Sequence, residues 1–305
     1  MAQIYPARPI SMVVPYAAGG PADIIGRVMA EGMRGPLGQP VIIENVAGAS
    51  GSIGVGRVAR AASDGYTCVL GDWNSHVLNG VMLALQYDLL KDFDPISLVS
   101  SEPYLLVTRK ALPAADLKEF VAWLRASPDQ ATQGTGGAGG VSTLGGLFFQ
   151  KETGTRFRFV PYRGGMGAAM SDLIAGQIDF MIDSAATTLP HVRAGAIKAY
   201  AVTAKRRLAS ASDIPTFEEA GLSSFDFSFW RAVWVPKGTS KDASARLNAA
   251  VAAALADPRV QARLADLEAQ IFPREQQTPE GLREFQRAEI EKWWPFIRVT
   301  GIKPQ

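Results

Sequence analysis

Three glycine-rich turns are the residues of this chain best suited to hold a ligand. They lie in residues 16–23 (YAAGGPAD), 134–140 (GTGGAGG) and 162–166 (YRGGM), each where a predicted strand meets a predicted helix. The N-terminus of a helix carries unpaired N–H groups and the positive end of the helix dipole, and glycine lets a ligand come close to that backbone. The three turns therefore predict the capture of an anion by backbone amides.

The motifs of the common catalytic and metal sites are absent from the sequence. It contains no GxxxxGK[ST], HExxH, CxxC or GxSxG motif, and its two histidines, His76 and His191, lack metal-ligand spacing. Ser75 and His76 are only sequence neighbours, which does not make a catalytic pair. We expect no catalytic residue, no metal and no cofactor. A loop is expected to follow the strand 66–70, with residues 71–75 and then His76 in it, and for His76 a structural role is favoured over a ligand contact. His191 is expected near a helix start at the surface.

Residues 134–139 also match the dinucleotide-binding pattern G-x-G-x-x-G letter for letter. A true site needs an acidic residue about 20 positions further on, at the end of the next strand. That strand ends at Arg163, which could suit a ribose phosphate, so a nucleotide-cofactor enzyme is the alternative function. A third possibility is an interaction module that has kept the fold and lost its ligand.

Three further side chains are candidates for the ligand site. Asp183 follows the predicted strand 178–182, and the carboxyl end of a parallel strand faces the binding crevice. Its carboxylate either contacts a ligand amine or hydroxyl, or caps the helix expected to start near Thr187. Trp73 and Trp230 either wall the site, which would leave aromatic carboxylates open as ligands, or belong to the core.

The composition narrows the remaining classes of protein to which the chain could belong. The 305 residues favour two domains, and the net charge of +2, with 31 basic and 29 acidic residues, gives no electrostatic case for nucleic acid. Cys68 is the only cysteine, so no intramolecular disulfide forms, and its apolar surroundings indicate a buried residue. No apolar run reaches the length of a membrane span, and no secretory signal is recognised. The first residues fit either a native start or a mature exported product.

Apolar runs alternate with helical patterns, which predicts an α/β fold with parallel sheets covered on both faces. Pro21 suits the first position of a helix that ends at Gly38, and Asp23 would offset its dipole. The sequence predicts two domains: the first comprises residues 1–103 and 226–305, and the second residues 104–225. Each is expected to be a doubly wound α/β domain. A ligand cleft and two hinge crossings are expected between them. The strands are expected at 10–14, 41–43, 66–70, 96–99, 104–108, 157–162, 178–182, 198–203 and 225–235. The helices are expected from 21, around 58, and at 116–126, 144–151, 166–174, 241–255, 258–267 and 279–299.

The chain resembles the solute-binding proteins of the tripartite tricarboxylate transporter family, also called Bug proteins, nearly from end to end. Two positions depart from the usual family pattern: Ala18 stands where a proline is common, and Thr143 where a histidine is common. The segments that carry the resemblance are Tyr5-Pro6, Val13-Val14-Pro15-Tyr16 with Gly19-Gly20, Leu37-Gly38-Gln39-Pro40, Gly48-Ala49-Ser50-Gly51, Asp64-Gly65-Tyr66-Thr67, Val160-Pro161-Tyr162-Arg163-Gly164, Ala201-Val202-Thr203, and Pro215-Thr216 with Glu219-Ala220-Gly221.

This resemblance implies an exported, periplasmic receptor with a type II periplasmic-binding-protein-like fold that closes on a small carboxylate and has no catalytic activity. The expected ligand is a dicarboxylate or an aromatic carboxylate. The expected partners are the membrane subunits of a tripartite transporter or a sensor kinase, and the receptor is expected to be a monomer. The implied ligand-binding residues are Tyr16, Gly19, Gly20, Thr135, Gly139, Gly164 and Gly165, with Ser75 and Asp183 setting distal specificity; their neighbours Ala17, Trp73, Ala138 and Met166 complete the predicted site.

Overall fold

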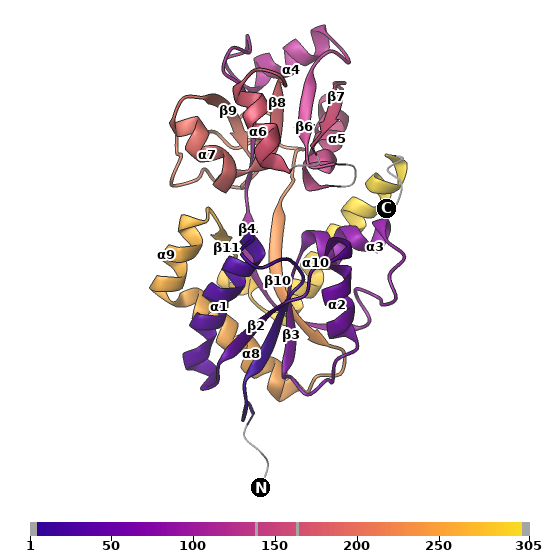
Figure 1. Ribbon diagram of the computed structural model, residues 1–305, viewed down its shortest axis with the longest axis vertical. Coiled ribbons are helices and arrows are strands. Elements are labelled where there is room, and N and C mark those ends of the chain that lie inside the picture. The colour runs from indigo at the N-terminus through magenta and orange to yellow at the C-terminus, as the bar shows by residue number, and fades with distance from the viewer. Residues whose placement is uncertain (1–4, 138–139, 163–164, 301–305) are drawn as a thin grey trace. The chain divides into compact units, whose positions relative to one another are not determined.

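The computed structural model describes residues 5–137, 140–162 and 165–300. The chain divides into two compact units: unit 1 is Met1–Ser101 with Phe229–Gln305, and unit 2 is Glu102–Ser228. The chain therefore passes from one unit to the other twice. Each unit has its own sheet with helices packed on it (Figure 1). The predicted α/β class, with two sheets flanked by helices, is confirmed.

The sheet of unit 1 has six strands in the order β11-β4-β10-β3-β1-β2. Strand β1 is parallel to β2 and to β3, whereas β10 is antiparallel to β3 and β11 is antiparallel to β4. The strands are β1 (Ile10–Val14), β2 (Val41–Asn45), β3 (Thr67–Asp72), β4 (Phe93–Glu102), β10 (Phe229–Pro236) and β11 (Gln270–Ile271).

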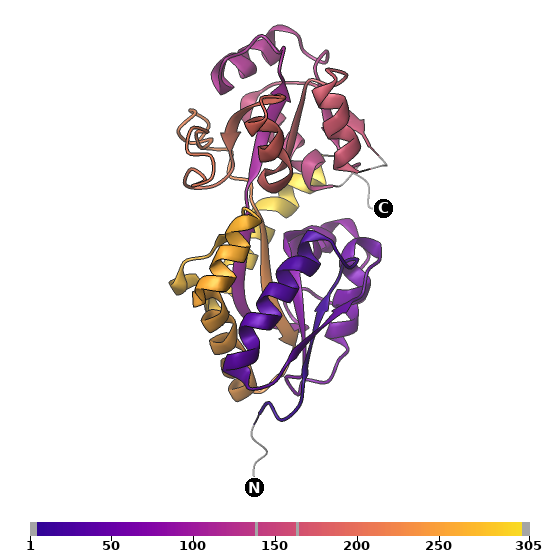
Figure 2. The same cartoon turned by 60° about the vertical axis from the view of Figure 1, so that its left-hand side comes forward.

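The helices of unit 1 come from both ends of the chain, and α1 packs against α8 and α9 (Figure 2). Helix α1 spans Pro21–Leu37 and is followed by the left-handed Gly38 (φ 70°), so both ends lie where the sequence predicted. The helices are α1 (Pro21–Leu37), η1 (Ala49–Gly51), α2 (Ser52–Ala59), η2 (Asn74–Leu78), α3 (Asn79–Met82), α8 (Lys241–Ala256), α9 (Pro258–Asp266), η3 (Arg274–Gln276) and α10 (Pro279–Val299).

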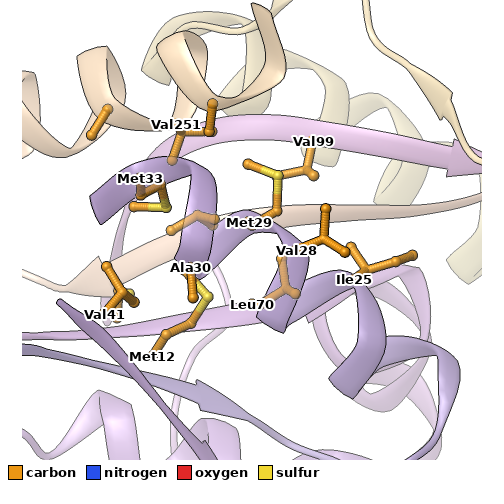
Figure 3. Close-up of a cluster of buried hydrophobic side chains, with 14 of the residues drawn as sticks. Met12, Ile25, Val28, Met29, Ala30, Met33, Val41, Leu70, Val99 and Val251 are labelled. Atoms are coloured by element: carbon orange, nitrogen blue, oxygen red, sulfur yellow. The ribbon is translucent and has the colours of Figure 1, made fainter. Parts of the chain in front are cut away.

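The core of unit 1 fixes α1 against the sheet. Met29 and Met33 of α1 are fully buried together with Met12 and Leu70 of the sheet and Val251 of α8 (Figure 3). Each buried side chain of this size stabilises the fold by about 1.5–3 kcal/mol relative to exposure. The start of α1 is thereby held in a constant place relative to the end of β1, which positions the first glycine turn.

The sheet of unit 2 has five strands in the order β7-β6-β8-β5-β9. Strands β7 and β8 are parallel to β6, and β5 is antiparallel to both β8 and β9. The strands are β5 (Tyr104–Arg109), β6 (Thr132–Thr135), β7 (Arg158–Pro161), β8 (Phe180–Ser184) and β9 (Ile197–Val202); the helices are α4 (Leu117–Ala126), α5 (Val141–Thr153), α6 (Met166–Ile174) and α7 (Ala185–Arg193).

Two sequence predictions about these elements are corrected. Both sheets are mixed rather than parallel, because continuous apolar runs report burial on both faces and say nothing of strand direction. Residues 71–75 were expected to be a loop, but β3 continues to Asp72 and a helical segment begins at once, with η2 leading directly into α3. Cys68 is buried as predicted, and burial raises the pKa of its thiol to about 12.

Candidate functional site

The carboxyl ends of three parallel strands meet at one edge of the sheet in each unit. In unit 1 these strands are β2, β1 and β3, and in unit 2 they are β7, β6 and β8. Each strand is followed by a helix, so α1, α2 and η2 begin at this edge in unit 1, and α5, α6 and α7 begin at it in unit 2. Both units therefore gather the positive ends of three helical segments at one edge.

The α-helices that follow the strands at these edges have no side-chain cap, whereas in η2 the Ser75 amide donates to the Asp72 carboxylate. Glycine is the N-cap residue of α1, α2, α5 and α6, and the cap of α7, Ser184, accepts no hydrogen bond through its side chain. Four helices that start elsewhere are capped by side chains: α4 by Asp116, α8 by Ser240, α9 by Asp257 and α10 by Thr278. A side-chain cap satisfies one of the free N–H groups of the first turn. At the uncapped helix starts no side chain takes up a first-turn amide, but backbone carbonyls already accept from Ser52 of α2, Ala168 of α6 and Ala185 of α7. Helix α3 continues directly from η2, and the Asn79 amide donates within that segment.

The first glycine turn exposes backbone between β1 and α1. Ala17, Ala18 and Gly19 are exposed, and Gly19 has a φ of 81°, a conformation that glycine adopts freely. The amide of Gly19 donates to the Asp23 carboxylate at 2.8 Å, and so this predicted ligand donor is already used. Asp23 lies in the first turn of α1 as predicted, and its hydrogen bond from Arg27 lowers its pKa. Within the described residues, the amides of Ala17, Ala18 and Gly20 donate to no other group.

Tyr16 is held at both of its ends. Its hydroxyl donates to Asp72 Oδ1 at 2.8 Å, and its carbonyl oxygen accepts from the Asn45 amide at 3.2 Å. Burial raises the pKa of Tyr16 well above its ordinary value, and the neighbouring Asp72 carboxylate adds to the shift. Tyr16 therefore stays a neutral hydrogen-bond donor, and it fixes the start of the first turn.

A strained loop borders the first turn. Gly48, Ala49, Ser50 and Gly51 have φ values of 127°, 43°, 53° and 90° in succession, which is rare for alanine and serine. The Ser50 carbonyl accepts from the side-chain amides of Asn74 and Asn79, and these bonds help to hold the strained backbone.

Helix α2 approaches the first turn closely because residue 54 is a glycine. A Cβ atom on Gly54 would lie 2.7 Å from the Val46 carbonyl oxygen and 2.9 Å from Pro15 Cα. Both of these are backbone atoms, which cannot give way without moving the turn. From the sequence this segment is recognisable only as rich in glycine, and the close approach at Gly54 is not.

The second glycine turn follows β6 in unit 2. Thr135, the last residue of β6, is 1% exposed, and its carbonyl oxygen accepts from the amide of Tyr162. The Gly136 amide donates to Ser142 Oγ at 3.1 Å, and the Thr143 hydroxyl donates to the Gly137 carbonyl at 2.7 Å. Thr143, one of the two departures from the family pattern, thus steadies the turn. Two predicted residues, Ala138 and Gly139, lie outside the described residues.

The structure explains Gly134 without a nucleotide. Gly134 lies inside β6, and a Cβ atom on it would be 2.5 Å from Ile178 Cδ1. The residue is therefore a glycine because neighbouring elements pack tightly there. In the dinucleotide pattern the first glycine serves a turn around the phosphates, which is a different role.

The third glycine turn precedes α6. Gly165 is exposed with a φ of 83°, its amide donates to the Tyr162 carbonyl at 3.1 Å, and Met166 begins the helix. Gly164 lies outside the described residues.

Asp183 lies at the carboxyl end of β8 and is 7% exposed. It is not the cap of α7, because Ser184 holds that position and the helix starts at Ala185 rather than near Thr187. Its Oδ2 accepts from the Thr187 hydroxyl at 3.0 Å. Burial raises the pKa of Asp183, against the effect of hydrogen bonds from Ser184 and Thr187. The carboxyl group therefore lies among neutral donors at the edge where three helices start.

Trp73, Ser75 and Trp230 are buried in unit 1, which for the two tryptophans is the core alternative and for Ser75 differs from the expected ligand contact. Trp73 has no exposed surface and packs edge-on against Trp293, with ring centroids 5.4 Å apart. Ser75 is also fully buried, and its amide donates to Asp72 while its hydroxyl oxygen accepts from the Asp72 amide. Trp230 is fully buried and donates to Glu289 at 3.1 Å.

His76 is a buried core residue in η2 rather than a loop residue. Its ring stacks on Trp234 with centroids 3.7 Å apart, and Nδ1 lies 3.0 Å from Ser75 Oγ. Nε2 has no hydrogen-bond partner among the described residues. Burial lowers the pKa of His76 to about 3. His191 lies in the last turn of α7, not at a helix start, and is partly exposed.

The pKa of His76 predicts a loss of stability in mild acid. The unfolded chain binds a proton on this residue near pH 6.5 and the folded chain only near pH 3, so the free energy of unfolding falls as pH falls through that range. The slope is at most about 1.4 kcal/mol per pH unit. We expect His76→Phe, which keeps a flat ring on Trp234, to lose less stability between pH 7 and pH 4 than the wild type does. Denaturant unfolding at both pH values measures this, and equal losses in the two proteins would contradict it.

Sequence reasoning missed the polar residues that support the first turn. Asp72, Asn45 and Arg231 all belong to this group, and Asp72 and Arg231 form an ion pair (Nη1–Oδ2, 3.2 Å) across 159 residues of sequence. Asp183 is singled out because it follows the carboxyl end of a predicted strand. The same criterion would also have identified Asn45 and Asp72. Only the pairing of β3 with β10 brings in Arg231.

Comparison with known proteins decides the family. The model of the tripartite tricarboxylate transporter family receptor, TctC, matches residues 25–302. The chain is also 35% identical over 304 residues to the protein BugT of Bordetella pertussis, covering 99% of this chain and 92% of that one. The chain belongs to the TctC receptor family. It is therefore a solute-binding receptor rather than an enzyme, and the alternative of a nucleotide-cofactor enzyme is set aside.

Solved structures agree with this membership. MatC from Rhodopseudomonas palustris, solved with bound malate, is 37% identical with a TM-score of 0.78, over 95% of this chain and 99% of that one. Rpa4515 of R. palustris, solved with adipate, is 30% identical with a TM-score of 0.81, over 99% of this chain and all of that one. In the described part of the receptor, no helix is long and apolar enough to cross a membrane, and no group of three or more His, Cys, Asp or Glu residues could hold a metal ion.

Proposed function

We propose that this TctC receptor is a periplasmic protein that captures a small aliphatic dicarboxylate with the uncapped helix starts of both units. The observation that carries the proposal is the contrast in capping. Helices at the two candidate edges start at glycine or at a serine whose side chain makes no capping bond, whereas α4, α8, α9 and α10 carry side-chain caps. A carboxylate is the anion that such N–H groups and helix dipoles bind well.

Two further observations favour an aliphatic dicarboxylate over an aromatic one. Malate and adipate, the ligands in the two R. palustris structures, both carry two carboxylates on an aliphatic chain. Trp73 and Trp230, the residues that left aromatic ligands open, are fully buried. Aromatic carboxylates are therefore the second candidate class of ligand.

The receptor's partners follow from its family. We propose that the ligand-bound form is presented by a monomer to the membrane subunits of a tripartite transporter or to a sensor kinase. Binding at turns on both units would favour a closed arrangement, as hinge-closing receptors show.

A ligand screen tests the proposal. The protein, unfolded and refolded to remove any carried-over ligand, is heated with malate, succinate, adipate, citrate, benzoate, aspartate and NADPH in turn. A ligand at about 100 times its Kd stabilises the fold by about 2.7 kcal/mol, which is readily seen as a rise in Tm. A shift with a dicarboxylate, confirmed by calorimetry, supports the proposal. A shift with benzoate alone would move the ligand class to aromatic carboxylates. Silence across the panel would contradict a carboxylate receptor and favour a module that has lost its ligand.

Asp183 is proposed to contact a donor group of the ligand. Its carboxylate lies among neutral donors at the binding edge of unit 2, and a ligand hydroxyl or ammonium would pair with it. We expect Asp183→Asn to weaken binding of malate about tenfold while changing binding of succinate, which lacks the hydroxyl, about threefold or less. Calorimetry with both ligands measures the difference. Equal losses for the two ligands would show that Asp183 only supports the fold.

A further inference from the structure

A buried ion pair lies beneath the first glycine turn. Asp72 ends β3, and Arg231 stands directly opposite it on the antiparallel strand β10. The guanidinium Nη1 is 3.2 Å from Asp72 Oδ2, and the two side chains are only 2% and 5% exposed. Burying two opposite charges gains little over burying apolar side chains of the same size, so stability alone does not account for the pair.

Tyr16 connects this pair to the turn. The Tyr16 hydroxyl donates to Asp72 Oδ1, the carboxylate oxygen that also accepts from the Ser75 amide. Ala17, Ala18 and Gly19, which follow Tyr16 directly, are exposed. The charges of Asp72 and Arg231 therefore lie one side chain away from the backbone offered to the ligand.

Charge at this depth acts strongly on a neighbouring anion. Buried charges are screened far less than surface charges, because little water or salt lies between them and the ligand. With both residues present, the pair adds no net charge near the first turn. Attraction for a ligand carboxylate then comes from backbone dipoles.

We propose that the mutual pairing of Asp72 and Arg231 keeps each of these buried charges from acting on the carboxylate site, so that backbone dipoles rather than a side-chain charge set how strongly the receptor prefers a dianion over a monoanion of the same shape. This inference rests on the proposed function. It assigns to the pair a role beyond positioning Tyr16: altering the charge on one side of the pair should change ligand preference, and the direction should follow the sign of the charge change.

The test compares each of succinate, malate and adipate with its own monoamide, which keeps the chain length and removes one charge. Calorimetry at low salt gives the ratio of the monoamide Kd to the dicarboxylate Kd. We expect Asp72→Asn, a charge change of +1, to raise this ratio about three- to tenfold. Arg231→Gln, a change of −1, should lower it by a similar factor. The double variant D72N/R231Q and the conservative Arg231→Lys, both without a change in charge, should return the ratio to within about twofold of the wild type.

A merely structural role gives a different pattern. If both single variants weaken the dicarboxylate and its monoamide by the same factor, and the double variant is the weakest of all, the inference is wrong and the proposed function stands. If the wild type binds none of the three dicarboxylates, the proposed function fails and the inference fails with it. Arg231→Gln leaves the Asp72 charge buried and is expected to lower Tm. If Arg231→Gln does not fold, the other two variants decide the test. The inference is supported if the ratio of the monoamide Kd to the dicarboxylate Kd rises in Asp72→Asn and not in the double variant. It is overturned if the ratio does not rise in Asp72→Asn.

Discussion

Gly20→Ser is expected to stabilise the receptor and weaken its binding of dicarboxylate at the same time. Gly20 is the N-cap of α1 with a φ of −79° and a ψ of 169°, a backbone that serine adopts without strain. A Cβ atom there would lie 3.5 Å from the Ala17 carbonyl oxygen, an ordinary contact. The serine hydroxyl would accept from an amide in the first turn of the helix, which removes that amide from the ligand.

Gly20→Ala is the matched control, because it adds the same Cβ atom without an acceptor. We expect the serine variant to exceed the alanine variant in unfolding free energy by about 1 kcal/mol. We expect it to bind dicarboxylate about ten- to a hundredfold more weakly than the alanine variant, since hydrogen bonds to a charged group contribute about 1.5–3 kcal/mol. Denaturant unfolding and calorimetry on both variants measure the two effects. Serine and alanine variants of equal affinity would show that the start of α1 does not hold the ligand.

Trp73→Ala is expected to cause the largest loss of stability of the changes considered. Trp73 is fully buried against Trp293, and removing a large aromatic side chain from such a site costs about 3–5 kcal/mol. Trp123→Ala is the control, because that ring is only partly buried on α4. Its loss should be clearly smaller. Urea unfolding of the three proteins at 25 °C gives the comparison.

Ligand affinity separates this core role from the role expected from sequence. Trp73→Phe keeps most of the packing and should leave dicarboxylate affinity within about twofold of the wild type. A tenfold loss of affinity in a variant that still unfolds cooperatively would indicate that Trp73 contacts the ligand, and would contradict a purely structural role for it.

The elements that position the site could be predicted because their signals are local. The apolar run of β1, Pro21 at the start of α1 and Gly38 after its end each act within a few residues, and all are confirmed. The described residues of the three glycine turns lie where a strand gives way to a helix, with Gly134 and Thr135 still inside β6. The parallel arrangement that brings the first turn to one edge of the unit 1 sheet, and the other two turns to one edge of the unit 2 sheet, follows from the alternation of strand and helix.

The errors arise where distant contacts override local composition. The run Gly71 to Ser75 looks like a loop because it is polar, yet Asp72 and Ser75 satisfy each other's backbone groups and so can be buried. Arg231 supplies the opposite charge from a strand whose partner cannot be read from the sequence. In the same way, the use of the Gly19 amide by Asp23 depends on the conformation of the turn rather than on its composition.

Strand β10 lies between β3 and β4 in the middle of the unit 1 sheet, and it comes from the far side of the 127 residues from 102 to 228 that form unit 2. A ribosome therefore completes every strand of unit 2 before the sheet of unit 1 can receive its central member. Until then β3 and β4 leave their edges unpaired, a state that exposed strands do not hold stably. The middle of the chain can thus fold during synthesis, whereas the first glycine turn and its support must wait for the last quarter of the protein to be made.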